Sequence, residues 1–406
     1  MAASKIGIVK SAAVAGLSLA AAWQAYAFAI VPNLRLSSPE LALAHRPHDA
    51  ASLSKRVGAK IKEAGAYVSA PSDASEAVRS LVFTPLSRSS LRIIGMDAAQ
   101  RGEADAARSA ITLSHRLSRR DPWTEIWLLE QAARKDDFDG ILTHYNAALS
   151  VNPELAPVLN PILVTATASP QVRLPLKEYL RGNAPWVPGY LAAASRDANI
   201  DDLVEMVMPV AHHLRGEPFT PALSAIVYRL AANGRWDEAM RVADATWTDF
   251  DAPKFAQMAL SDASTDLRLG QLAWSLGSEQ GVASSLTRDG GLEARLSPLA
   301  RGTIASRDMR LSGPGQYAFT QRVDFGGSWQ GARLRWSADC VPASGAPPER
   351  VWDQTLPVAS KATTYRSTVS VPGGCNLLRL TLSGTGPEGQ SEALFSVGDL
   401  AFTKTR

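Results

Sequence analysis

Three patterns of apolar and polar residues follow one another along the chain. Residues 11–31 form an uncharged and largely apolar run, and the nearest charged residues are Lys10 and Arg35. Residues 40–260 place apolar positions at helical spacing, whereas residues 262–406 alternate apolar and polar positions between turns rich in Gly, Ser and Thr. This change from a 3.6-residue to a 2-residue period predicts a helical part followed by a β part.

The N-terminal run has the length and composition of a membrane-spanning helix. About 20 apolar residues cross a bilayer as a helix, because a helix satisfies its own backbone hydrogen bonds in hydrocarbon. Lys5 and Lys10 precede the run and favour a cytoplasmic N-terminus. We therefore expect residues 1–34 to be a cytoplasmic tip and a single-pass anchor in the inner membrane, with residues 11–32 in the bilayer and the rest of the chain in the periplasm.

Two other interpretations of this run stay open. Ala25-Tyr26-Ala27 is an A-x-A site that follows an apolar core, so the run also fits a signal peptide cleaved after Ala27, which would leave a periplasmic protein. The third interpretation is a buried helix of a soluble protein.

The helical part, expected over residues 35–261, contains helix pairs at a regular spacing. The small residues Ala107, Gly140 and Ala239 each fall where the two helices of a pair cross. Their separations of 33 and 99 residues are one and three lengths of a unit of about 34 residues. The pattern resembles the tetratricopeptide repeat family. The resemblance implies stacked helix pairs with a concave surface that binds a partner protein, and a plain helical scaffold is the alternative.

The β part, expected over residues 262–406, consists of short alternating segments. They cover residues 316–325, 332–340, 365–371, 378–382 and 393–402. In the second segment Trp336 is predicted in the core and Arg335 on the outward face. Strands at this spacing predict an antiparallel β-sandwich or jelly roll.

Four segments of the β part come in a characteristic order. They are an early strand with Trp274, a strand over 291–296, the phrase 309–317 and a last strand over 395–402. In this order they resemble the jelly-roll carbohydrate-binding modules. The resemblance implies glycan binding, in which aromatic rings cover the apolar face of a sugar and polar groups bind its hydroxyls.

Four residues are candidates for such a glycan site. Trp329 lies in a Gly-rich turn and is expected to be exposed, while Trp352 lies beside Asp353 after a Pro-rich loop. Together with Arg335, these residues combine aromatic faces with charged groups. Each also has a plain structural interpretation, as a ring folded onto its own domain or as a charge on a solvated strand face.

The two cysteines, Cys340 and Cys375, both lie in the β part. In an oxidising compartment they would close one disulfide-bonded loop. Two separate buried thiols are the alternative.

Composition and motifs argue against several kinds of chemistry. A formal net charge of +3 gives no reason to expect nucleic-acid binding. The chain contains no Walker A loop, G-x-S-x-G or H-E-x-x-H motif, and its S-x-x-K match, Ser52–Lys55, has no S-D-N after it. His45 and His48 are three residues apart but have no evident third ligand. We therefore expect no catalytic residue, metal or cofactor.

The layout as a whole resembles bacterial envelope proteins that accompany exopolysaccharide and capsule assembly. It implies a non-enzymatic, membrane-anchored adaptor, in which the helical repeats bind a partner protein and the sandwich binds a glycan or a second protein. The alternative is an envelope polysaccharide-acting enzyme, a lyase or hydrolase helper with unidentified carboxylates. A self-associating structural protein is the third interpretation.

Overall fold

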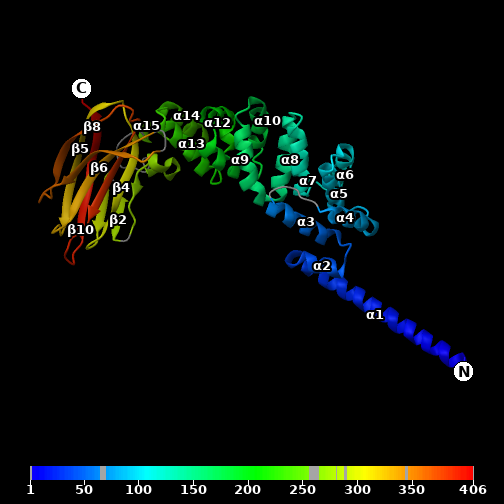
Figure 1. The fold of residues 1–406 in the computed structure, drawn as a ribbon. Helices are drawn as coiled ribbons and strands as arrows, with labels where there is room; N and C mark the ends of the chain where they lie inside the picture. Colours follow the sequence, from blue (N-terminus) through cyan, green and yellow to red (C-terminus); the bar gives the residue numbers. More distant parts are fainter. Residues whose placement is uncertain are drawn as a thin grey trace. The chain divides into compact units, whose positions relative to one another are not determined.

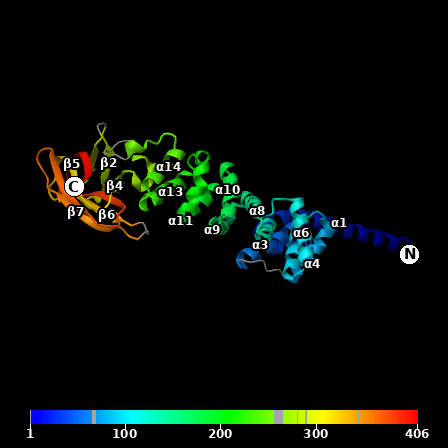
Figure 2. The same ribbon diagram turned by 90° about the horizontal axis from the view of Figure 1, so that it is seen from above.

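The chain forms two compact units, Met1–Leu155 and Ala156–Arg406. The computed structural model, drawn in Figures 1 and 2, describes residues 2–64, 70–255, 265–279, 281–287, 290–342 and 346–405. The boundary expected between residues 261 and 262 lies outside these described residues. In the described residues, helices precede strands, and the expected order of a helical part and an antiparallel sandwich is confirmed.

The first unit is helical. Its elements are α1 (Ala2–Ser37), α2 (Pro39–His45), α3 (Ala50–Ala64), α4 (Pro71–Phe83), α5 (Arg88–Gln100), α6 (Ala104–Leu117), α7 (Pro122–Ala133), α8 (Phe138–Val151) and the short 3-10 helix η1 (Pro153–Leu155). Within α1, Val14–Ser37 is long and apolar enough to cross a membrane. The side chains of Ala27 and Val31 on α1 are buried within the unit.

Consecutive helices of the first unit pair closely at small residues. A Cβ atom added at Gly95 of α5 would lie 2.7 Å from Ile111 Cγ1 of α6. A Cβ atom at Gly140 of α8 would lie 3.2 Å from the Cβ atom of Ala132 on α7. These close crossings are consistent with a repeat domain of helix pairs. The tetratricopeptide assignment itself stays a prediction.

The second unit begins with helices and ends with strands. Its helices are α9 (Ala156–Ala166), α10 (Pro170–Arg181), α11 (Val187–Asp197), α12 (Ile200–Val207), η2 (Met208–His213), α13 (Thr220–Ala232), α14 (Trp236–Thr246), α15 (Ala252–Phe255) and η4 (Leu267–Leu272). Its strands are β1 (Ser275–Leu276), β2 (Val282–Leu286), β3 (Leu292–Leu296), β4 (Arg301–Arg310), β5 (Gly315–Gly327), β6 (Arg333–Val341), β7 (Glu349–Leu356), β8 (Thr363–Val371), β9 (Leu377–Thr385) and β10 (Ala393–Lys404).

The strands form two five-stranded antiparallel sheets. Sheet A has the order β1-β4-β9-β6-β7, and sheet B has the order β2-β3-β10-β5-β8. Alternate residues of each sheet fill one core between them, because successive side chains of a strand point to opposite faces. Trp336, predicted in the core, is 1% exposed there and packs edge-on against Trp274 and Phe319.

Helices of the second unit pack against the outer face of sheet A. Tyr228 of α13 donates a hydrogen bond to Asp308 of β4, and Arg379 of β9 donates to both oxygens of the same carboxylate. The buried Arg307 of β4 donates to the carbonyls of Leu272 and Phe255. Buried polar contacts therefore join the last helices to the sandwich.

Candidate functional site

The four candidate residues from the sequence lie at three different places in the sandwich. Arg335 of β6 and Asp353 of β7 form an ion pair on the outer face of sheet A, with side chains 48% and 44% exposed. Trp352 precedes Asp353 on the same strand and therefore points to the opposite face, where its ring lies 6.0 Å from that of Phe319. The structure brings Arg335 and Asp353 together and separates them from the ring of Trp352.

Trp329 is half-buried and packs onto sheet B. Its ring lies 4.8 Å from Phe325 and 5.8 Å from Phe395, edge-on to both. Its indole N–H donates to the carbonyl oxygens of Gly326 at 2.8 Å and Leu394 at 3.2 Å. The ring therefore holds the turn after β5 against β10 and does not project freely into solvent.

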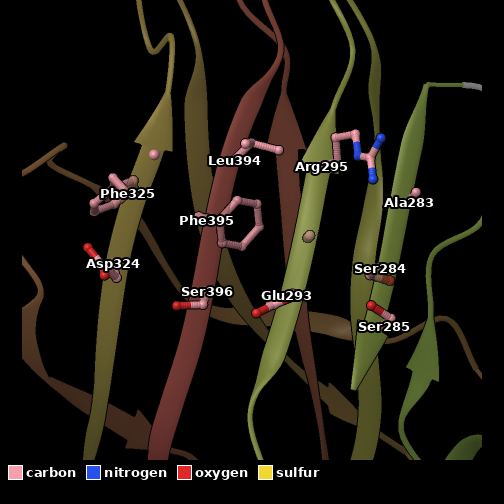
Figure 3. Close-up of a pocket in the computed structure, with 12 residues that line it drawn as sticks. Ala283, Ser284, Ser285, Glu293, Arg295, Asp324, Phe325, Leu394, Phe395 and Ser396 are labelled. Carbon is pink, nitrogen blue, oxygen red and sulfur yellow. The ribbon is translucent and has the colours of Figure 1, made fainter. Parts of the chain in front are cut away.

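One hollow of the sandwich lies on the outer face of sheet B. It has a volume of about 490 Å³ and is open to solvent. Residues of β2, β3, β10 and β5 line it, and the side chains are drawn in Figure 3. We call this hollow the sheet B groove. The rings of Phe325 and Phe395 that Trp329 contacts belong to the core side of the sheet, so Trp329 lies on the face opposite the outward side chains of the groove.

Strand register places two contrasting rows of residues on the groove floor. The polar row crosses four strands and consists of Ser285, Glu293, Ser396 and Asp324, which are register partners in that order. Figure 3 shows Ser396 between the two acidic residues. Because strands lie about 4.8 Å apart, the Cα atoms of Glu293 and Asp324 are separated by about 10 Å.

The second row runs beside the first and is less polar. It consists of Ala283, Arg295, Leu394 and Gly326, again register partners across the same four strands. Leu394 is 44% exposed, and Arg295 lies 3.7 Å from Glu392. The groove therefore offers carboxylate and hydroxyl groups along one line and an exposed apolar side chain along the next. Such a surface can accept hydrogen bonds from hydroxyl groups and contact C–H groups at the same time.

A second hollow of about 540 Å³ extends the groove along the strands. It shares Glu293, Asp324 and Ser396 with the groove and adds Arg322 and Asp399. The two hollows together make an elongated surface across sheet B.

Sequence reasoning did not single out the groove residues. Glu293, Asp324 and Ser396 are common residue types, and each stands alone between apolar neighbours in its own strand. The alternation does show that they point outward. Only the order of the strands in sheet B places them in one row.

Cys340 and Cys375 form a disulfide in the structure, with Cα atoms 5.5 Å apart. The bond links β6 to the turn before β9. It closes a loop of the chain that includes β7 and β8.

The S-x-x-K serine and the two histidines noted in the sequence take part in packing and hydrogen bonding within the first unit. Ser52 is fully buried, and its hydroxyl donates to the Asp49 carboxylate at 2.6 Å. His45 lies against the rings of Trp23 and Tyr26. His48 stacks on Phe83, with ring centroids 4.9 Å apart. His45 and His48 thus have different aromatic neighbours.

Several solved structures of carbohydrate-binding modules are similar to about a third of this chain. A solved structure described as CBM4 covers 36% of this chain and all of its own length, at 10% identity and a TM-score of 0.27. TmCBM61, solved in complex with β-1,4-galactotriose, covers 37% of this chain and all of its own length, at 9% identity and a TM-score of 0.25. A family 16 module covers 36% of this chain and 99% of its own, at 12% identity and a TM-score of 0.26.

No protein-family model matches the chain, and no curated protein matches it either.

Proposed function

We propose that this chain is a non-enzymatic, membrane-anchored adaptor of the bacterial cell envelope whose β-sandwich binds a glycan in the sheet B groove. In this role the helical repeats bind a protein partner and the anchor keeps the complex at the inner membrane. We assign this adaptor to the assembly or export of exopolysaccharide or capsule.

The pairing of a polar row with an apolar row is the observation that carries the proposal. A sugar ring has hydroxyls around its edge and C–H groups on its faces. The polar row supplies carboxylate acceptors at Glu293 and Asp324 and a hydroxyl at Ser396, while Leu394 supplies an exposed apolar contact. Two adjacent rows of this kind complement one sugar face and its neighbouring hydroxyls.

The charge of the groove favours a neutral glycan. On the elongated surface the three acids Glu293, Asp324 and Asp399 outnumber the two basic residues, Arg295 and Arg322. Arg295 also lies beside Glu392. Carboxylates accept hydrogen bonds from neutral hydroxyls but repel the carboxylates of a uronic acid polymer. We therefore assign the groove to a neutral polysaccharide.

The surroundings of α1 support an anchor that is retained. Ala27, the residue at which a signal peptide would be cleaved, is buried in the first unit, as is Val31 one turn later. Trp23 and Tyr26 are about half exposed on the same helix and lie beside His45.

The test is glycan binding by the full chain in detergent, measured by calorimetry. The probes are a soluble neutral β-glucan, a neutral β-galactan and, as an acidic polymer, polygalacturonate. Glu293→Gln and Asp324→Asn each remove a charged acceptor and are expected to weaken binding of a neutral polymer about tenfold, since such hydrogen bonds contribute about 1.5–3 kcal/mol. Asp353→Asn on sheet A is the matched control and leaves binding unchanged.

Three results would contradict the proposal in different ways. Binding that falls with Asp353→Asn and not with Glu293→Gln moves the site to sheet A. Release of reducing ends from a polymer, abolished by Asp324→Asn, makes the chain an enzyme. No binding to any of the polymers by a folded chain makes the sandwich a surface for protein contact.

A further inference from the structure

Three side chains from consecutive helices of the first unit converge on one point. His115 lies in the last turn of α6, Glu125 in the first turn of α7 and His144 within α8. The Nδ1 atom of His115 lies 2.8 Å from Glu125 Oε1, and the Nδ1 atom of His144 lies 2.7 Å from Glu125 Oε2. The two imidazole rings meet edge-on, with centroids 5.5 Å apart.

Glu125 is a buried carboxylate, and the two imidazoles are its counterparts. Its side chain is 0% exposed, and each carboxylate oxygen contacts one histidine. The neighbouring acid Asp121 has a separate cation, because Arg92 Nε donates to it at 2.7 Å. A buried carboxylate is stable only when a cation or several hydrogen-bond donors compensate its charge. His115 and His144 can compensate the carboxylate by donating hydrogen bonds to its two oxygens. A divalent cation in their place would compensate it with more positive charge.

The donor set matches one class of metal ion. Two imidazole nitrogens and one carboxylate oxygen suit zinc and similar transition metals, whereas magnesium and calcium prefer oxygen ligands. One ligand atom from each of the three residues lies within 4.8 Å of the other two. Ligand atoms around a tetrahedral zinc are about 3.3 Å apart, as zinc–nitrogen bonds of about 2.0–2.1 Å require. The two Nδ1 atoms already lie 2.8 and 2.7 Å from the two carboxylate oxygens of Glu125.

Access and packing also suit a bound ion. The side chains of His115 and His144 are 22% and 19% exposed, so an ion can reach them from solvent. Glu125 forms the buried side of the cluster. Three protein ligands leave a fourth tetrahedral position open toward water.

We propose that His115, Glu125 and His144 bind one zinc-class divalent cation that crosslinks α6, α7 and α8. The ion takes the place of the hydrogen bonds between the imidazole nitrogens and the carboxylate. When a neutral imidazole binds through Nδ1, its proton moves to Nε2, and a protonated imidazole releases one proton to water. The crosslink joins the pair α5–α6 to the pair α7–α8, and it is independent of the glycan site.

The test is titration of the tag-free full chain in detergent with Zn²⁺, followed by calorimetry. We expect one Zn²⁺ per chain. His144→Asn and Glu125→Gln are each expected to lower the affinity at least 100-fold. The matched control is the double variant His212→Asn and His213→Asn, because it removes two neighbouring imidazoles of η2 that lie outside the proposed site. The control is expected to keep the wild-type stoichiometry and affinity.

A second measurement uses the wild-type chain, so it does not depend on whether the variants fold. Co²⁺ in a four-coordinate nitrogen and oxygen site gives strong visible absorption, which excess Zn²⁺ abolishes and Mg²⁺ leaves unchanged. Wild-type affinity in the double variant His115→Asn and His144→Asn would overturn the proposal, as would loss of binding only in the His212 and His213 control. A Co²⁺ spectrum identical to that of the aqueous ion would also overturn it.

Discussion

The hydrogen bond from Tyr228 to Asp308 tests how firmly α13 is attached to sheet A. Tyr228 Oη donates to Asp308 Oδ2 at 2.8 Å, and Asp308 is 1% exposed. Tyr228→Phe removes this donor, but Arg379 still donates to both carboxylate oxygens, at 2.7 and 2.8 Å. Hydrogen bonds to charged groups contribute about 1.5–3 kcal/mol, and we expect a loss of about 1.5 kcal/mol because no oxygen is left without a donor.

Removing the charge of Asp308 is expected to destabilise the unit more. Loss of one partner from a buried ion pair costs about 3–5 kcal/mol, and the side chain of Arg379 is 28% exposed, so we expect the lower value of about 3 kcal/mol for Asp308→Asn. In that background the acceptor is neutral, and Tyr228→Phe should cost under about 1 kcal/mol. The double-mutant cycle therefore yields a coupling energy of at least about 0.5 kcal/mol between the two residues.

The assay is urea unfolding of the full chain in detergent, followed by tryptophan fluorescence and by far-ultraviolet circular dichroism. The control is Tyr365→Phe, since Tyr365 donates to the neutral carbonyl of Pro357. A Tyr228→Phe variant that loses no more stability than this control would refute the reasoning. Coincident shifts of both signals would show that helices and sandwich of the second unit unfold together.

Alkaline pH offers a second readout of the same contact. Burial, followed by the negative charge of Asp308, raises the pKa of Tyr228 above its ordinary value of 10.0. The stability that depends on the neutral phenol is complete below pH 10.0 and is lost as pH rises toward the folded-state pKa. Tyr228→Phe should remove that part of the decline above pH 10.0.

Two further predictions concern the disulfide and the end of α1. Cys340→Ala should lower the free energy of unfolding by about 3–4 kcal/mol, judged from the length of the closed loop. Reduction of the wild-type disulfide should cause the same loss of stability in urea unfolding, and an unchanged midpoint on reduction would contradict this prediction. Burial raises the pKa of the Asp49 carboxyl, but hydrogen bonds from Arg35 and Ser52 outweigh it and place the pKa below the ordinary 3.8. The contribution of Asp49 to stability is therefore present above pH 3.8 and lost below it, and thermal unfolding of Arg35→Gln should show a shallower acid decline than wild type.

Local patterns in the sequence predicted the strands that alternate strictly. The segments 316–325, 378–382 and 393–402 lie inside β5, β9 and β10, since a face that meets the core must be apolar at every second residue. The strand β4 was not predicted. Its residues from Arg301 to Arg310 include the buried Arg307 and Asp308, which read as surface residues until helices of the same unit cover them.

Aromatic residues near turns were the candidates for a binding site, and the structure shows that neighbouring rings pack against them. Trp329 lies in a turn as expected, but the rings of Phe325 and Phe395 are close enough to take up much of its surface. Trp352 points into the sandwich because side chains alternate along β7 and Asp353, its neighbour, points outward. Exposure of a side chain depends on neighbours that are distant in sequence, and the sequence pattern does not show those neighbours.

By itself the sequence determined the order of the parts: an apolar N-terminal helix, paired helices with small residues at their crossings, and an antiparallel β part. These features depend on periodicity within short segments, which each segment carries alone. Tertiary structure decided which residues meet. Glu293 and Asp324 share a groove because β10 lies between β3 and β5, and His115, Glu125 and His144 converge because three helices pack side by side. Both clusters join residues that are far apart in the chain, and only the packing of the elements brings them within reach.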